Sequence, residues 1–457
     1  MKVIRRIRSW SILVAAFVAG SLCATPASAQ TNDDEEVVVV KAGRIITVTG
    51  DEIERGEIVI IDGKIELVGK RLEYPKSATI IDASTETVMP GLLHAATRYG
   101  APNYGRSGVH ANLAAIDDFY LDEIDLEPLL EAGFTAAAYQ PPGNGIPGVA
   151  TVVRLSGAEE DRVLDRRSYI RVTMTNPGRD KRVLAGALKK AQAEIDKVEK
   201  ARKEWEEKKK KEAEEKAKKE AEEKKKNDGE NGGEVSADDP KPDEKEKKEG
   251  EGEDGEKKEE KFEPPKIDPA HQPLVDLIQK KDGVFLLIEI GAASDYLHAE
   301  DALGEYADRP HHYHLQPSWR SDFHHIVEQL GEADALVMTS PMISRLPDTA
   351  VRYNLAGELA LAGVKVALTP PNDSWWGIEN FRSSIANLTR AGMSRADAAK
   401  ALALSPWTLV GLDGRFGSIE KGKDADLIFL DRDFLDPSAR VTRVMTNGTV
   451  TWESEEN

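Results

Sequence analysis

The stretch that divides this chain into two patterns is Thr87–Arg98, TVMPGLLHAATR. Before it, residues 36–89 alternate strongly and are rich in Val and Ile, which is typical of half-buried strands. After it, compact apolar runs such as Phe134–Tyr139 and Val284–Ile290 are followed by helical patterns. Strands that alternate with helices predict parallel β/α units, so we expect an α/β protein.

Turn signals predict that the two ends of the chain meet. Asp62-Gly63 near the start and Asn447-Gly448 near the end each lie between two strand-like runs. Asp-Gly and Asn-Gly pairs are favoured in tight hairpin turns, because both central residues adopt a positive φ. A β-rich segment at each end therefore predicts one small sheet structure that both termini share.

One segment does not fit a compact domain. Across residues 185–226, apolar residues recur at helical spacing as far as Trp205, and beyond it Glu precedes Lys by four residues in repeated pairs. That order stabilises a helix, so we expect a charged, coiled-coil-like helix that projects into solvent. Residues 227–265 are dominated by Gly, Pro, Asp, Glu and Lys, which predicts disorder. The charged helix is either a spacer or a surface for a protein partner.

Residues 1–29 are typical of a secretory signal peptide. A basic start precedes the apolar run Trp10–Leu22, and Ala27-Ser28-Ala29 is a small-x-small cleavage site. A membrane anchor is the alternative, but the run is short for a bilayer and no later run is long enough. We expect an exported protein, periplasmic or extracellular, without a membrane span in the mature chain. The net charge of −19 argues against nucleic-acid binding.

Three stretches resemble the family of metal-dependent amidohydrolases, in particular its imidazolonepropionase-like members. Thr87–Arg98 is similar to the V-M-P-G-L-I-D-A-H-T-H motif of the first barrel strand in that family. Gly417–Ile428, GSIEKGKDADLI, is similar to its G-S-I-E-x-G-K-D-A-D-L segment, and Ala391–Gly411 resembles the helix before that segment.

The resemblance implies both a fold and an activity. The fold is a (β/α)8 barrel of the TIM type over residues 90–414, with a β-sandwich formed by residues 36–89 and 415–457. The charged helix and the disordered stretch would then be an insertion within the barrel domain. The activity is hydrolysis of non-peptide carbon–nitrogen bonds at a metal held by histidines from several barrel strands and by an aspartate on the last strand.

Several of the metal-ligand positions implied by the resemblance hold residues that cannot bind a metal. The His-x-His pair of the first strand falls on Ala96 and Arg98. Alanine has no donor atom, and the guanidinium group is a permanent cation that repels a metal ion. A later strand of the family matches Leu287–Ala292, which places Glu289 and Gly291 at ligand positions.

The remaining two positions are only partly filled. The last-strand aspartate falls on Pro371, and a shift of two residues would place Asp373 there instead. His314 matches the remaining histidine. We therefore expect no metal cofactor. The alternative is a rearranged zinc site made of Glu289, His314 and Asp373.

Three further residues are candidates for the pocket. His94 lies two residues before Ala96, so strand alternation points both to the same side. It is either a displaced ligand or a structural histidine. Trp375 and Trp376 follow a late strand, where barrel enzymes keep their pockets, and they suit either a flat or sugar-like ligand or simple packing.

Two functional classes follow from these residues. One is a non-catalytic relative that keeps the barrel as a binding module, with a small-molecule ligand that the sequence does not identify. The other is an active hydrolase with a rearranged metal site. For the first class we expect a metal-free pocket in which Arg98 faces Glu289, with His94 and His314 nearby.

The export signal gives the first testable prediction. When the chain is expressed in a bacterium with a functional secretion system, the exported protein should begin at Gln30, as read by intact mass. The Ala29→Arg variant should keep its signal, because cleavage needs a small residue at that position. An intact N-terminus on soluble cytosolic wild-type protein would contradict the prediction.

Overall fold

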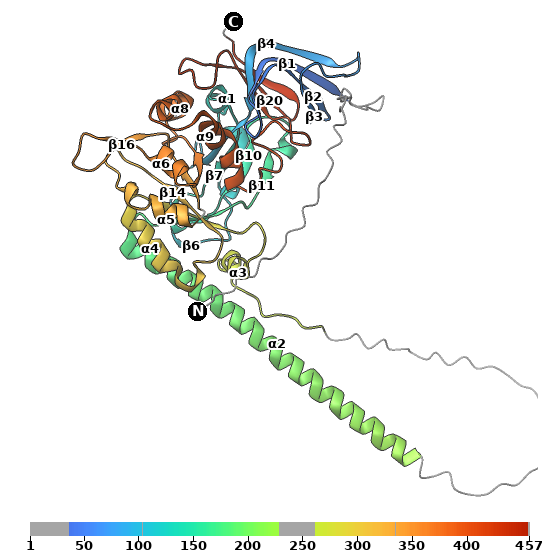
Figure 1. The fold of residues 1–457 in the computed structure, drawn as a ribbon. Coiled ribbons are helices and arrows are strands. Elements are labelled where there is room, and N and C mark those ends of the chain that lie inside the picture. The colour runs from blue at the N-terminus through green and yellow to red at the C-terminus, as the bar shows by residue number, and fades with distance from the viewer. Residues whose placement is uncertain (1–35, 103, 228–260, 334, 456–457) are drawn as a thin grey trace, which may run out of the picture.

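A computed structural model describes residues 36–102, 104–227, 261–333 and 335–455 (Figure 1). The predicted signal peptide, residues 1–29, lies outside these residues, and so does most of the predicted disordered stretch, residues 227–265. In the described part of the chain, no helix is long and apolar enough to cross a membrane.

Both ends of the chain contribute to one seven-stranded sheet, which we call the chain-end sheet. Its strand order is β21-β20-β19-β4-β1-β2-β3. The strands are β1 (Val37–Ile45), β2 (Ile53–Ile61), β3 (Lys64–Gly69), β4 (Thr79–Pro90), β19 (Leu427–Leu430), β20 (Val441–Thr446) and β21 (Thr449–Glu453). The prediction that the two termini share a sheet is confirmed.

The two predicted hairpin turns touch each other. Asp62, Gly63, Asn447 and Gly448 all have positive φ, as the turn signals require. A Cβ atom on Gly63 would lie 2.5 Å from Oδ1 of Asn447, so only glycine fits at this contact. The tips of the β2–β3 and β20–β21 hairpins therefore pack together.

By strand pairing, the chain ends form one continuous sheet, and the two facing sheets of the predicted β-sandwich are not confirmed. The physical reason is direct pairing between the ends, because β19 runs antiparallel to β4 with Ile428 opposite Met89. The two faces of this single sheet carry separate apolar clusters. One cluster includes Val38 and Val40, and the other includes Val39, as the alternation of a strand requires.

The α/β class is confirmed by a second group of strands, which we call the strand array. Its parallel strands are β5 (Leu92–Thr97), β7 (Phe134–Tyr139), β12 (Ile170–Thr173), β13 (Leu286–Ile290), β14 (His311–Leu315), β15 (Leu336–Thr339) and β18 (Lys365–Leu368). One antiparallel segment lies between β7 and β12. It consists of β9 (Gly148–Val149) and β10 (Thr151–Arg154).

The array does not close into a continuous hydrogen-bonded barrel. Its strands belong to two sheets, β11-β10-β7-β5 and β18-β15-β14-β13-β12-β9, which the segment containing β9 and β10 joins. In the described residues no strand pairing links β18 to β5. Side chains connect these two edges instead, since Oγ1 of Thr369 lies 3.3 Å from Nδ1 of His94.

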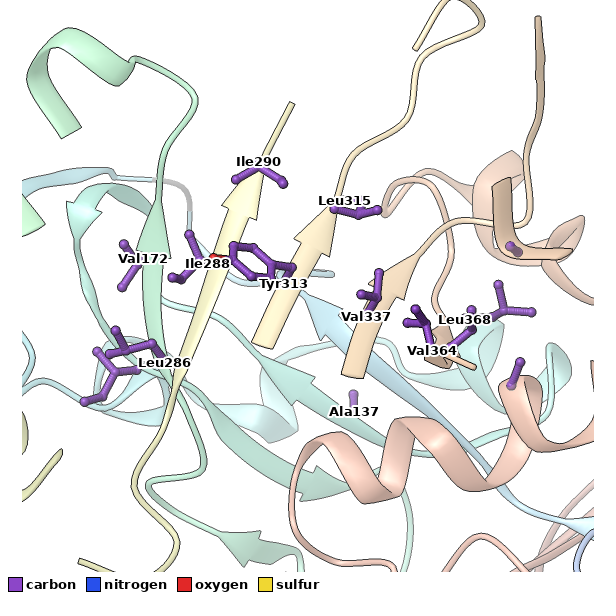
Figure 2. Packing of buried hydrophobic residues seen from close by; sticks show 14 of the residues in the cluster. Ala137, Val172, Leu286, Ile288, Ile290, Tyr313, Leu315, Val337, Val364 and Leu368 are labelled. Carbon is purple, nitrogen blue, oxygen red and sulfur yellow. The ribbon is translucent and has the colours of Figure 1, made fainter. Parts of the chain in front are cut away.

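Alternation along the strands separates two faces of the array. Ile288, Tyr313 and Val337 are cross-strand neighbours whose side chains pack into the main apolar core (Figure 2). Leu287 and Met338 point to the opposite face, which we call the inner face, and belong to a separate buried cluster. The inner face therefore carries apolar side chains such as Leu287 and Met338 together with the polar cross-strand neighbours of Leu287, Arg171 and His312.

Helices and short strands complete the α/β part. The helices are α1 (Glu127–Glu131), α2 (Pro177–Asn227), α3 (Gln272–Ile278), α4 (Ala293–Leu303), α5 (Val327–Glu332), α6 (Leu355–Leu361), α7 (Trp375–Glu379), α8 (Phe381–Arg390), α9 (Arg395–Ala399) and α10 (Ser405–Leu409). The short strands are β6 (Arg106–Val109), β8 (Gly143–Ile146), β11 (Val163–Asp165), β16 (Ile343–Arg345) and β17 (Arg352–Asn354).

The predicted charged helix lies within α2, which projects far from the body (Figure 1). Its first turns are anchored, since Leu184, Leu188 and Ala191 are fully buried. The ion pairs along the exposed part run from base to acid, as in Lys208–Glu212, whereas the sequence predicted the reverse order. Exposed pairs of this kind stabilise a helix only weakly, so neither order is strongly imposed.

The anchoring of α2 is testable by two substitutions in the same helix. Leu188→Ala should lower the free energy of unfolding by about 2–5 kcal/mol, because it leaves a cavity in the core. Glu207→Ala, on the exposed part, should change it by less than about 0.5 kcal/mol. Urea denaturation followed by circular dichroism measures both values, and equal effects would contradict the anchoring.

Candidate functional site

Polar side chains gather where the parallel strands end, around a cavity of about 450 Å³ that we call the mouth cavity. The carboxyl ends of parallel strands are the usual position of a functional site in α/β folds. The residues that line the cavity are Ala96, Thr97, Arg98, Gln140, Arg171, Glu289, His314, Leu315, Gln316, Pro317, Ser340, Pro370, Pro371, Asn372 and Asp373.

Strand register explains why Glu289 and His314 are neighbours. The two residues lie directly opposite each other in the parallel pair β13–β14, and both belong to the inner face. Met338 on β15 is the cross-strand neighbour of His314. On the same face, Arg171 and His312 flank Leu287 one layer below Glu289 and His314, so polar side chains occupy two successive layers of the inner face.

Asp373 is held by the end of β5. Its Oδ1 accepts a hydrogen bond from Thr97 Oγ1 at 2.6 Å, and its Oδ2 accepts one from the Arg98 backbone N–H at 2.8 Å. Nε2 of the buried His94 lies 3.2 Å from Oδ1. Burial would raise the pKa of Asp373, but His94 and these hydrogen bonds outweigh it and lower the pKa.

His94 thus lies beneath the mouth cavity as a connecting side chain. It is 1% exposed, and its two ring nitrogens lie near Thr369 and Asp373, which both follow β18. Of the two interpretations of His94, the contacts favour the structural one. The histidine joins β5 to the segment after β18, where no backbone ladder is present in the described residues.

Glu289 pairs with a residue that sequence reasoning missed. Its Oε2 accepts hydrogen bonds from Nη2 of Arg171 at 2.7 Å and from Nε at 3.2 Å. Arg171 is itself fixed, because its Nη1 donates to the backbone oxygens of Pro141 and Gly143 at 3.0 Å. Arg98, which was expected to face Glu289, lines the same cavity, and the printed hydrogen bonds of Glu289 go to Arg171.

Charge around Glu289 explains its ionisation. Burial would raise the pKa of Glu289, but the adjacent Arg171, with His314 and Arg98 further away, lowers it below the usual value. Burial lowers the pKa of His314 to about 4, against the attraction of Glu289. At neutral pH the pair is therefore a carboxylate beside an uncharged imidazole.

The other candidates are distributed more widely. Gly291 is exposed beyond the end of β13 and does not line the mouth cavity. Pro371 lines both the mouth cavity and a second cavity of about 1040 Å³, which also contains Trp376. Trp375 lines a different cavity, of about 620 Å³, beside the C-terminal strands. The two tryptophans therefore do not form one platform.

The residues at the mouth do not fit a divalent metal. Among the described residues, no group of three or more His, Cys, Asp or Glu side chains is placed to hold a metal ion. Ala96 offers no donor atom, and Asp373 is held by β5. Glu289 is paired with Arg171. The alternative set of Glu289, His314 and Asp373 is therefore not assembled as a ligand shell.

Comparisons with known proteins agree with the fold. Residues 359–451 match the model of the amidohydrolase family. The crystal structure of an amidohydrolase from Thermotoga maritima MSB8 covers 91% of this chain and 100% of its own, with a TM-score of 0.64 and 20% identity. The structure of an uncharacterized protein covers 92% and 100%, with a TM-score of 0.50 and 14% identity.

A curated relative matches a short segment. A dihydroorotase from Caldicellulosiruptor saccharolyticus is 42% identical over 55 residues, which are 12% of this chain and 13% of that protein. This chain thus matches only about an eighth of the length of that relative. The family match thus covers residues 359–451, and the Thermotoga maritima amidohydrolase shares its fold with most of this chain.

The ion pair of Glu289 makes a testable prediction about pH. Glu289→Gln should lower the free energy of unfolding by about 3–5 kcal/mol at pH 7, because it leaves the buried Arg171 unpaired. The folded-state pKa of Glu289 is depressed, so this stabilisation is present above the usual pKa of about 4.3 and is lost as the pH falls through the folded value.

Denaturant unfolding at several pH values measures the difference between wild type and variant. That difference should shrink below about pH 4. Glu328→Gln, at an exposed position on α5, serves as the matched control and should have little effect. A difference that stays constant from pH 7 down to pH 3 would contradict the ion-pair explanation.

Proposed function

We propose that this protein is an exported member of the amidohydrolase family whose mouth cavity binds a small polar molecule without a metal and without hydrolysing it. The observation that carries the proposal is the state of the two carboxylates at the mouth. Asp373 is hydrogen-bonded to the end of β5, and Glu289 is paired with Arg171.

The lack of a suitable base supports the non-catalytic role. Hydrolysis needs a group that takes a proton from water, and the family uses an aspartate at the end of the last strand for this step. Asp373 is the nearest equivalent, but its lowered pKa makes it a weaker base than an ordinary carboxylate. Two donors already occupy its oxygens.

The composition of the mouth cavity indicates the kind of ligand. Two guanidinium groups, Arg98 and Arg171, are balanced by the carboxylates of Glu289 and Asp373, and His314 is uncharged at neutral pH. A cavity of about 450 Å³ with balanced charge suits a small neutral or zwitterionic molecule. Compounds with amide groups match both the donors and the acceptors of this lining.

Three further parts of the proposal rest on the sequence. Export is supported by the signal-like residues 1–29. A protein partner or a spacer role for α2 is supported by its charged surface and its projection from the body (Figure 1). A relationship to proteins with a closed (β/α)8 barrel is supported by the family motifs and by the order of the parallel strands.

The second candidate function is an active hydrolase of carbon–nitrogen bonds with a rearranged zinc site. The observation that favours it is the direct juxtaposition of Glu289 and His314 on neighbouring strands. This function would require Glu289 to leave Arg171 and Asp373 to leave β5. Both rearrangements would expose charges that are now paired, which is costly in a partly buried site.

Metal analysis of the full mature protein separates these two functions. We expect less than about 0.1 equivalent of zinc after dialysis, because no ligand shell is assembled. We also expect no hydrolysis of cyclic amides or acyl-amino compounds. An Ala96→His/Arg98→His variant adds the two missing imidazoles and should retain more zinc than wild type, which shows that the assay detects a site.

An active metal-dependent hydrolase would give a different set of results. About one equivalent of zinc that survives dialysis of the wild type, and is lost in His314→Ala, would establish the metal-dependent hydrolase. His325→Ala is the control, because His325 is exposed and does not line the mouth cavity. Turnover of an amide substrate that is abolished by His314→Ala alone would lead to the same conclusion.

A further inference from the structure

A second and larger cavity lies beside the mouth cavity. Its volume is about 1040 Å³, and we call it the hairpin cavity because the β16–β17 hairpin forms one wall. Residues of α6, α7, α8 and of the segments after β15 and β18 also line it, and Figure 1 shows β16, α6 and α8 on one side of the body. The two cavities share Ser340, Pro371 and Asn372.

Positive charge is concentrated in this cavity. Arg345 and Arg352 lie directly opposite each other in the hairpin, an arrangement that is unfavourable for like charges. Neither forms an ion pair with a described residue, and both are exposed. Arg390 from the end of α8 also lines the cavity, whereas Glu358 is its only acidic lining residue. In a chain with a net charge of −19, this is a marked local excess.

The surroundings of the arginines are fixed. The backbone N–H of Arg345 donates to the Trp319 oxygen at 2.9 Å, which holds the hairpin to the loop before α5. Asn354 caps α6 and donates to the Leu388 oxygen at 2.9 Å, which holds the hairpin to α8. A repulsive pair on a well-anchored hairpin indicates that the cost is offset by an anion that binds there.

The cavity also offers a surface for a ring. Trp376 is 57% exposed and lines the cavity together with Tyr353. Ser340, at the boundary of the two cavities, is 7% exposed, and its Oγ has no hydrogen-bond partner among the described residues. A buried hydroxyl group without a partner is costly unless a ligand or water completes its hydrogen bonding.

We propose that the hairpin cavity binds an acidic saccharide. Its carboxylate would lie between Arg345 and Arg352, where bidentate pairing removes the repulsion. The apolar face of the sugar ring would pack on Trp376, and its hydroxyl groups suit the polar lining. The volume of about 1040 Å³ admits a short oligosaccharide more readily than a single inorganic anion.

This inference does not rest on the function proposed for the mouth cavity. Arg345, Arg352 and Trp376, whose variants test it, line the hairpin cavity and are not among the residues that line the mouth cavity, whereas Ser340 lies at the boundary of the two. A failure to bind acidic sugars would leave the metal and hydrolysis tests of the mouth cavity unaffected. A failure of the metal and hydrolysis tests would likewise leave the binding of acidic sugars unaffected.

The test is isothermal titration calorimetry, in which trigalacturonate is titrated into the full mature protein. We expect saturable binding that weakens as salt is added, because the contact is charge-assisted. Arg345→Gln/Arg352→Gln and Trp376→Ala should each weaken it at least tenfold. Arg55→Gln, an exposed arginine of the chain-end sheet, should leave it unchanged.

The same titration contains the results that would overturn the proposal. Binding of a neutral trisaccharide, or of benzoate, as tight as that of trigalacturonate would exclude an acidic saccharide as the preferred ligand. No binding, or equal binding by the hairpin variants, would exclude the cavity. The double arginine variant should melt no lower than wild type, because it removes a like-charge pair, so loss of binding is separable from loss of folding.

Discussion

The carboxylate of Asp373 joins the two edges of the strand array, and the whole candidate site depends on this bridge. No strand pairing links β18 to β5 in the described residues, so side chains must hold the edges together. Asp373 does so by accepting hydrogen bonds from Thr97 and from the Arg98 backbone, beside the buried His94. A carboxylate used in this way stabilises the site by joining β5 to the segment after β18.

A second interaction, the ion pair between Arg171 and Glu289, stabilises the opposite wall of the mouth cavity. Arg171 supplies positive charge there, and Glu289 balances it at 2.7 Å. A buried ion pair contributes little net stability unless further hydrogen bonds satisfy it, and Arg171 has two of these to backbone oxygens. The pair therefore fixes the wall without creating an open coordination position.

Local patterns predicted the hairpins and the charged helix. The resemblance to amidohydrolases, and not a local pattern, singled out Ala96, Arg98, Glu289 and His314, and the structure brings them to one cavity. Arg171 was missed because β12 has only four residues and gives no periodic signal. Trp375 and Trp376 were grouped as one surface, but consecutive helical residues point about 100° apart, which separates them between two cavities.

The sequence Thr369-Pro370-Pro371 connects the two cavities physically. Proline fixes its own φ and restricts the residue before it, so this segment leaves β18 in an extended form. Two residues after Pro371, Asp373 reaches back to β5. Pro371 and Asn372 line both cavities. The path of the chain through this segment thus places Asp373 against β5 and helps to build the larger cavity beside the mouth cavity.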